Sequence, residues 1–273
     1  MSFFKTVFLL VFILAGIIVA LYCWLWKPPK PILNVSVFTD IYNLPADKKV
    51  INTNEPIVFE SGTKCVFGCP CINDTCDSKI TLLESKWKEF NPDVVLVNIK
   101  KYFFIPGMVT PVDKFGMAGE LYELAKNKKE EVYSYDLPDD TLINKLIKKY
   151  PAAEVAVTFL YNACHDDLLT FNKTDREDHI RHFLVSHRTF RLEGKTNAVK
   201  EIEDAIEKDF GKQDKQHDNL KNMPNYINDL SLEIYRLRFR HLLSILDHFN
   251  KAGKKVFLLC DLETAAHLQT EIK

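Results

Sequence analysis

The chain has 273 residues, of which 47% are hydrophobic, and this is enough to build the core of one large domain or two small ones. Its 36 Lys and Arg residues nearly balance its 37 Asp and Glu residues, for a formal net charge of -1. This balance excludes a broad basic field, so we expect no nucleic acid among the partners of the chain.

An apolar segment lies near the start of the chain. Between Thr6 and Trp26 no Asp, Glu, Lys or Arg occurs, and the segment is long enough to cross a hydrocarbon core of about 30 Å. It ends in Tyr22, Trp24 and Trp26, as is typical of the aromatic belt at a membrane interface, whereas a cleaved signal peptide has a shorter apolar region followed by small residues. We predict that residues 1–28 are a transmembrane signal-anchor and that the chain is a single-pass membrane protein. Cleavage is the alternative.

Four cysteines, Cys65, Cys69, Cys71 and Cys76, follow one another with the spacing C-x3-C-x-C-x4-C. Such clusters persist most readily as disulfides outside the cytosol. Structural zinc is the competing interpretation, but it usually needs two C-x2-C pairs or one such pair with two distant histidines, and neither pattern occurs. We therefore expect disulfides among these cysteines and an extracytoplasmic domain, whether periplasmic, lumenal or extracellular.

The rest of the chain predicts a stalk and an α/β body. Residues 29–56 begin with a Pro-rich run and are expected to be extended. The body, residues 57–273, alternates short apolar runs with helical patterns, which predicts a central sheet, mainly parallel or mixed, flanked by helices. The expected strands are Ile57–Glu60, Asp93–Asn98 and Glu131–Tyr135, and the helices that follow them are Ser78–Phe90, Phe115–Asn127 and Asp139–Tyr150.

A helical stretch separates these elements from the last strand. From Pro151 to about Phe249 the pattern is helical, and then Val256–Cys260 is expected to be a buried strand and Leu262–Ile272 a closing helix. Candidate helix caps are Asp175, Asn197 and Asn228. Since no internal repeat occurs, we predict a helical insertion layer within a single α/β domain.

Four segments, in this order, resemble the superfamily that includes TraB, the GumN-like proteins, the Tiki membrane proteases, the ChaN haem-binding lipoproteins and, more distantly, the erythromycin esterases. They are GTKC from Gly62, ITLLESKWKEFNPDVVLVN from Ile80, GMAGELYELAKNKKEEVYSYD from Gly116 and YRLRFRHLLSILDHFNKAGKKVFLLCDLETAAHLQTEI from Tyr235. The resemblance covers roughly half of the body. It implies the α/β fold, and a site in which paired Gly-x-x-His loops and a strand-end Glu support metal-dependent hydrolysis or ligand binding.

The positions that match this site carry other side chains. Cys65 replaces the first His, Asn98 the Glu, Glu263 the second His, and Cys260 the second Gly. The Asn98 amide oxygen is a weak metal ligand, and a disulfide at Cys65 would remove its thiolate. We therefore expect no catalytic residue and no cofactor; a divalent metal held by Cys65 and Glu263 is the alternative.

The location of a remnant crevice is also predicted. In open α/β sheets ligands bind beyond the carboxyl ends of the parallel strands, and we expect the matched loops to meet there. The candidate residues are Gly62, Thr63, Cys65, Asn98, Cys260, Asp261 and Glu263. The resemblance adds Glu120, Arg238 and Arg240, for which the alternative is a charged helix face.

Other common signatures are missing from the sequence. It contains no G-x-S-x-G, H-E-x-x-H, P-loop or G-x-G-x-x-G motif, which excludes the usual serine hydrolases, zincins and nucleotide-binding proteins. His179, His182 and His187 lie close together, but the arginines among them favour a solvent-facing helix over a metal site. The sequence thus predicts a membrane-anchored pseudoenzyme that binds a small ligand or a protein; the alternative is a divergent metal-dependent hydrolase that uses Cys65, Glu263 and Asp261.

Overall fold

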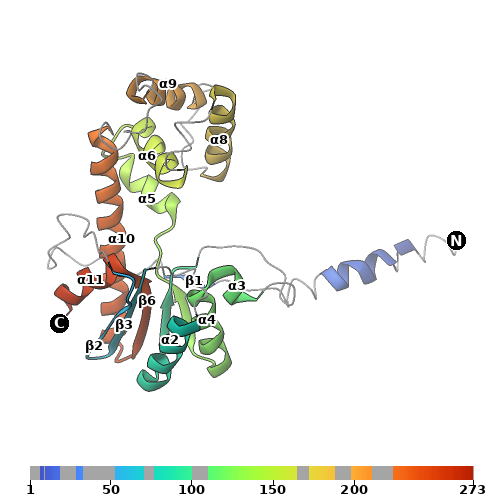
Figure 1. Cartoon of the computed structure of the whole chain (residues 1–273). Helices are drawn as coiled ribbons and strands as arrows, with labels where there is room; N and C mark the ends of the chain where they lie inside the picture. Colours follow the sequence, from blue (N-terminus) through green and yellow to red (C-terminus); the bar gives the residue numbers. More distant parts are fainter. Residues whose placement is uncertain are drawn as a thin grey trace. The chain divides into compact units, whose positions relative to one another are not determined.

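The computed structural model describes residues 7–8, 10–18, 29–32, 53–70, 77–99, 110–164, 172–187, 198–210 and 224–272. The chain divides into two compact units (Figure 1). The first is formed by Met1–Ile32, Val50–Asp136 and Leu246–Lys273, and the second by Leu33–Lys49 and Leu137–Ile245. The predicted α/β class is confirmed, and the helical insertion that we expected within one domain is a compact unit with a core of its own.

The first unit contains a six-stranded sheet with the order β1-β5-β4-β6-β3-β2. Every neighbouring pair is parallel except the edge pair of β2 and β3, so the sheet is mainly parallel, as predicted. The strands are β1 (Lys30–Pro31), β2 (Ile57–Ser61), β3 (Lys64–Cys69), β4 (Val94–Val97), β5 (Glu131–Ser134) and β6 (Val256–Asp261).

The central strands are continuous apolar runs because both of their faces are covered. The sequences VVLV in β4 and VFLLC in β6 are buried throughout, as parallel strands between helical layers require. Strand β3 was not predicted, although Cys65 to Cys69 are all buried. The sequence predicted disulfides among its cysteines, and only its pairing with β6 identifies it as a central strand.

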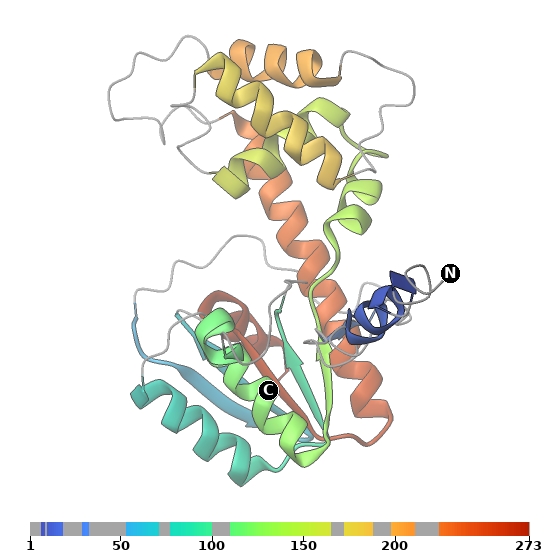
Figure 2. The ribbon, with the colours of Figure 1, turned by 90° about the vertical axis from the view of Figure 1, so that its right-hand side faces the viewer.

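Helices cover the two faces of the sheet. Alternate strand residues, among them Cys65, Phe67 and Phe257, pack in one core with the buried residues of α2 (Asp77–Phe90) and α4 (Met117–Lys128). Figures 1 and 2 show these two helices on the same side of the sheet. The opposite face is covered by α11 (Leu262–Glu271) and by the end of α10 (Asn225–Lys251), whose Phe249 ring contacts Tyr133 of β5.

A short helix, α3 (Pro111–Phe115), precedes α4 and crosses it closely. It begins with a capping box in which Thr110 and Asp113 bond each other's backbone N–H groups, and it has Pro111 at its first turn. Gly119 of α4 packs directly on α3, because a Cβ atom there would lie 2.0 Å from the Pro111 carbonyl oxygen. This contact fixes the start of α4 beside the sheet.

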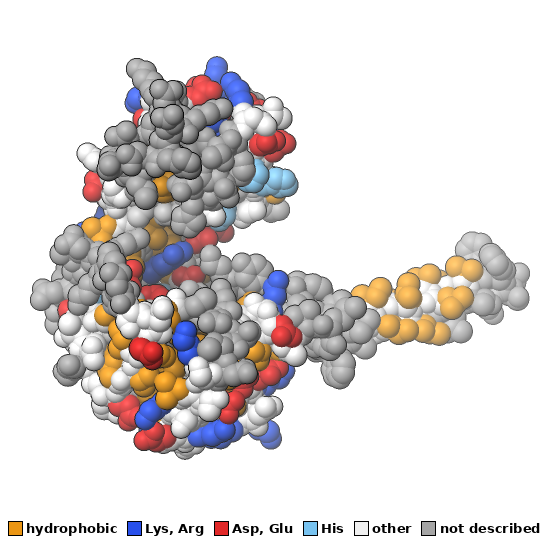
Figure 3. Space-filling model, in the orientation of Figure 1, with side chains coloured by type: hydrophobic (Ala, Val, Ile, Leu, Met, Phe, Trp, Pro, Cys, Tyr) orange, Lys and Arg blue, Asp and Glu red, His pale blue; other side chains and the backbone are white. Residues whose placement is uncertain are grey.

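The N-terminal segment is helical at residues 7–8 and 10–18. Its side chains are apolar and exposed on the isolated chain, as the orange surface of this segment in Figure 3 shows. Within the part of the chain that the structure describes, no helix has both the length and the apolar character that crossing a membrane requires. The transmembrane helix from Thr6 to Trp26 therefore stays a prediction, and several of its residues lie outside the described ranges.

The second unit is helical. It consists of α5 (Asp139–Leu146), α6 (Ala152–Cys164), α8 (Lys173–Ser186), α9 (Ala198–Phe210) and α10 as far as Ile245, packed around one apolar core. Two predicted caps are wrong. Helix α8 is capped by Asn172, which accepts a bond from the Asp175 N–H, and α10 already begins at Asn225, upstream of Asn228. Asn197 lies outside the described residues.

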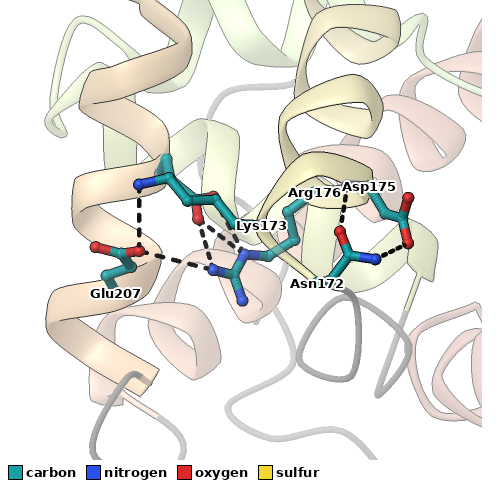
Figure 4. Close-up of polar contacts among 6 residues, drawn as sticks. Asn172, Lys173, Asp175, Arg176 and Glu207 are labelled. Atoms are coloured by element: carbon teal, nitrogen blue, oxygen red, sulfur yellow. Dashed lines mark hydrogen bonds and ion pairs between the residues drawn. The ribbon is translucent and has the colours of Figure 1, made fainter.

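A buried ion pair joins α8 to α9 in this unit (Figure 4). The Arg176 guanidinium donates from Nε to both carboxylate oxygens of Glu203, at 3.0 and 3.2 Å, and from Nη2 to Oε1 at 2.6 Å. The side chains are 16% and 3% exposed, respectively, so the pair is shielded from water. Glu207, 3.9 Å from Arg176 and 3.8 Å from Lys173, extends the contact towards the surface.

Candidate functional site

The candidate site is the carboxyl edge of the parallel sheet. Strands β3, β4, β5 and β6 run in the same direction, so their last residues meet at this edge. In register, Cys69 of β3 lies opposite Asp261 of β6. Ligands of open α/β sheets bind beyond this edge, so its side chains are the ones available to a ligand.

Asp261 ends β6 and caps the helix that follows. Its carboxylate accepts the Thr264 N–H at 2.7 Å and the Thr264 hydroxyl at 2.9 Å. A side chain that holds a helix N-terminus in this way has a structural role, and its oxygens are already occupied by two donors. Asp261 is therefore at the predicted edge, but it is poorly suited to ligate a metal.

Glu263 and Asn98 also lie at the carboxyl edge of the sheet. Glu263 is half-buried in the first turn of α11, where the helix dipole favours a negative charge. Asn98 follows β4 directly and is exposed. The positions matched to the strand-end Glu and the second His therefore follow the neighbouring parallel strands β4 and β6.

The predicted location of Gly62 and Thr63 is wrong. They form the turn between the antiparallel strands β2 and β3, so they lie at the amino end of β3 and not beyond its carboxyl end. The Thr63 carbonyl accepts the N–H of Val256, the first residue of β6, and its hydroxyl bonds Asn250 Oδ1 at 2.8 Å. The GTKC segment is therefore a hairpin at the opposite edge of the sheet.

Cys65 is separated from the candidate site for the same reason. Cys65 pairs in register with Phe257 of β6, which is four residues before Asp261. Four residues of a strand span about 13 Å. Ligands of one metal ion each lie about 2.0–2.3 Å from it. Cys65 therefore does not share an ion with Asp261 or Glu263.

Cys65 and Cys260 occupy opposite faces of the sheet. Cys65 belongs to the core under α2 and α4, while Cys260 pairs with Gly68, whose Cα faces Ala265 of α11. Both are buried free thiols, which differs from the disulfide expected for Cys65. Cys65 and Cys69, four residues apart on one strand, are too distant for a bond to each other. Cys71 and Cys76 lie outside the described residues, so disulfides involving them stay a prediction.

Burial makes both thiols chemically inert. Desolvation, followed by the charge of Glu60, raises the pKa of Cys65 to about 12, and desolvation together with Asp261 raises the pKa of Cys260 well above its usual value. The thiolate is the reactive form, so neither residue is a ready nucleophile or metal ligand at neutral pH.

We expect Cys65 and Cys260 to resist alkylation in the folded protein. A pKa of about 12 in place of 9.0 leaves about a thousand-fold less thiolate at pH 8, and burial slows the reagent further. Brief treatment of the full chain with N-ethylmaleimide, followed by peptide mass spectrometry, should leave both residues unlabelled, and treatment in urea should label them. Native labelling of Cys65 at the rate seen in urea would contradict this placement.

Cys69 is the cysteine at the carboxyl edge. It is fully buried as the last residue of β3, and its Sγ atom lies 3.3 Å from Sδ of Met117, the equally buried first residue of α4. Pro70, the next residue, is exposed. The sequence suggests only a disulfide for Cys69 and no role for Met117, because no motif brings two residues 48 positions apart together.

Glu120 lies one turn further along α4 and is half-buried. Its pKa is raised by burial and then by repulsion from Glu84 and Glu123. These are helix-surface carboxylates, so the alternative interpretation of Glu120 as a helix-face charge is the better description of its surroundings.

Arg238 and Arg240 belong to the helical unit. Arg238 donates from Nη2 to Asp139 Oδ1 at 3.0 Å, and Asp139 also lies 3.6 Å from His187 Nε2. The Arg240 carbonyl accepts the Ser244 hydroxyl within α10. Both residues belong to the helical unit and Arg238 has its ion-pair partner there, so we do not include them in the candidate site.

Of the three clustered histidines, His179 and His182 lie within α8 and His187 is its C-cap. Nδ1 of His179 and of His187 bonds a carbonyl one turn earlier, at 2.9 and 3.0 Å, while His182 is exposed. Among the described residues, no group of three or more His, Cys, Asp or Glu side chains is arranged to hold a metal ion.

Comparisons add no relative to this description. No protein-family model, curated protein or solved structure matches the chain.

Proposed function

We propose that this protein is a membrane-anchored domain of the TraB, GumN and ChaN-like type that acts by binding at the carboxyl edge of its sheet and not by catalysis. The observation that carries the proposal is the separation of the residues that hydrolysis would need. Cys65 is about 13 Å from the level of Asp261, and Asp261 is engaged by Thr264. The alternative hydrolase built on Cys65, Glu263 and Asp261 has no support from this arrangement.

The sheet is the feature of the resemblance on which the proposal draws. A mainly parallel sheet with helices on both faces agrees with the fold that the resemblance implies. The match of GTKC to a ligand loop does not agree, because this segment is a hairpin turn. The proposal therefore uses the resemblance for the fold and takes the function from the edge residues.

The anchor is supported by the apolar N-terminal helix. Large side chains from Val7 to Ile18 are exposed, and a contiguous apolar surface of this kind favours contact with lipid or protein. We assign it to a lipid bilayer, with the body of the chain on the extracytoplasmic side.

Membrane attachment is tested by fractionation. The full chain should remain in the membrane pellet after alkaline carbonate extraction. Changing Val11 and Leu14 to Arg should release it, because two charges inside the apolar span oppose insertion, and at the centre of a span one charge costs about 2.5–3.5 kcal/mol. Lys5→Gln is the matched control and should not release the protein. Retention of the double-arginine variant would contradict the anchor.

The absence of catalysis is tested separately. The purified full chain in micelles, supplied in turn with zinc, manganese or cobalt, should hydrolyse an unstructured protein substrate no faster than buffer with the same metal. Hydrolysis that is lost on Glu263→Gln would overturn the noncatalytic assignment and leave the anchor unaffected.

A further inference from the structure

The start of α8 carries a sequence that the proposed function does not use. Asn172, Lys173 and Thr174 form an Asn-x-Thr triplet, with Asn172 as the N-cap of the helix. Such a triplet is an acceptor for N-linked glycosylation when its middle residue is not Pro. All three residues are exposed, as the attachment of a bulky, hydrated oligosaccharide requires.

The two ends of the Asn172 amide have separate tasks. Its Oδ1 atom accepts the Asp175 N–H at 3.0 Å and so caps α8. Its Nδ2 atom donates to Asp175 Oδ2 at 2.6 Å. An amide nitrogen carries two hydrogens, and this bond uses one of them. Replacement of the other hydrogen by a sugar would therefore leave both the cap and the bond to Asp175 in place.

The contacts that join α8 to α9 involve other side chains. Arg176 bonds Glu203, and Lys173 Nζ lies 3.8 Å from Glu207. Asn172 bonds Asp175 of its own helix, as Figure 4 shows. A glycan on Asn172 is thus compatible with the buried ion pair of the helical unit.

We propose that Asn172 is an N-glycosylation site that takes an oligosaccharide from a polyprenyl diphosphate carrier. Nδ2 attacks the anomeric carbon of the first sugar, and the new C–N bond forms as the C–O bond to the diphosphate breaks. The diphosphate leaves with that electron pair, one amide proton passes to a base of the transferase, and no oxidation occurs. The proposal rests on the extracytoplasmic placement in the proposed function, and it specifies the lumenal compartment.

Expression of the full chain in a eukaryotic cell tests the site. The parent carries Asn34→Gln and Asn73→Gln, which remove the other two Asn-x-Ser/Thr triplets, so that one shift in gel mobility reports one site. We expect a single shift that peptide-N-glycosidase reverses, with mass spectrometry locating the resulting aspartate at position 172. Thr174→Ala keeps the Asn172 cap and should abolish the shift, whereas Thr174→Ser, the matched control, should keep it.

A second variant and a second measurement make the result decisive. Asn172→Ser should also abolish the shift, and it retains a good helix cap, so its folding is not at risk. Protease protection of intact microsomes reports the side on which the body lies. If the body is protected but no shift occurs, or if Thr174→Ala keeps the shift, the site is overturned and the extracytoplasmic placement stands. If added protease digests the body, both the placement and the site are overturned.

Discussion

Gly119→Ala is expected to lower the free energy of unfolding of the sheet unit by about 3 kcal/mol or more, at the upper end of overpacking effects. Inside a helix, alanine is normally favoured over glycine by about 1 kcal/mol. Here the new Cβ would lie 2.0 Å from the Pro111 carbonyl oxygen, 2.3 Å from its carbon and 2.7 Å from the Val112 nitrogen. These are backbone atoms that cannot rotate away, so the clash outweighs the gain in helix propensity.

The measurement is urea unfolding of the full chain in micelles, followed by circular dichroism and tryptophan fluorescence. Gly253→Ala is the matched control. Its φ of +68° strains an alanine, but nothing lies within 4 Å of the new Cβ, so we expect a loss of only about 1–2 kcal/mol. If Gly119→Ala were as stable as the parent, α3 would not pack on α4 as described.

Much of the sheet unit follows from local patterns. The strands near residues 57, 94, 131 and 256 were predicted because short apolar runs that alternate with helical patterns are typical of the buried strands of an α/β sheet. The helices α2, α4 and α11 were predicted within two residues of their observed ends. In these elements the face that is apolar in the sequence is the face that is buried in the structure. Tertiary packing therefore does not change the element that the local pattern predicts.

The candidate site was less predictable, because it depends on topology. Glu60 and Cys65 pair across a hairpin, and this pairing turns GTKC away from the carboxyl edge, although its composition suits a ligand loop equally well. Cys69 meets Met117 only because β3 lies beside β6 and α4 covers that face. The spacing of residues within one segment cannot predict a contact between residues that are distant in the sequence.

Arg176 illustrates the same limit in the helical unit. In the sequence it is one of several charges on α8, and a solvated helix face is the natural interpretation. In the structure the side chain is 16% exposed and makes three hydrogen bonds to Glu203, which is 27 residues away on α9. Burial, which the sequence does not report, separates this pair from ordinary surface charges.

Arg176→Met should therefore destabilise the helical unit by about 3–5 kcal/mol, because it leaves the Glu203 carboxylate buried without its cation. Hydrogen exchange of the α8 and α9 amides in the full chain measures this loss in the unit concerned. The double variant, Arg176→Met with Glu203→Leu, should recover most of the lost free energy of unfolding. An apolar pair of similar volume leaves no charge to be desolvated.

The control is an ion pair between a cation and a carboxylate at the protein surface. Lys88 and Glu84, 60% and 33% exposed, lie 2.9 Å apart on α2. Lys88→Met should change stability by less than about 1 kcal/mol, because water already screens that pair. If Arg176→Met were as mild as Lys88→Met, the Glu203 carboxylate would have to be hydrated in solution. The double variant would then give no recovery, because no buried charge would need to be removed.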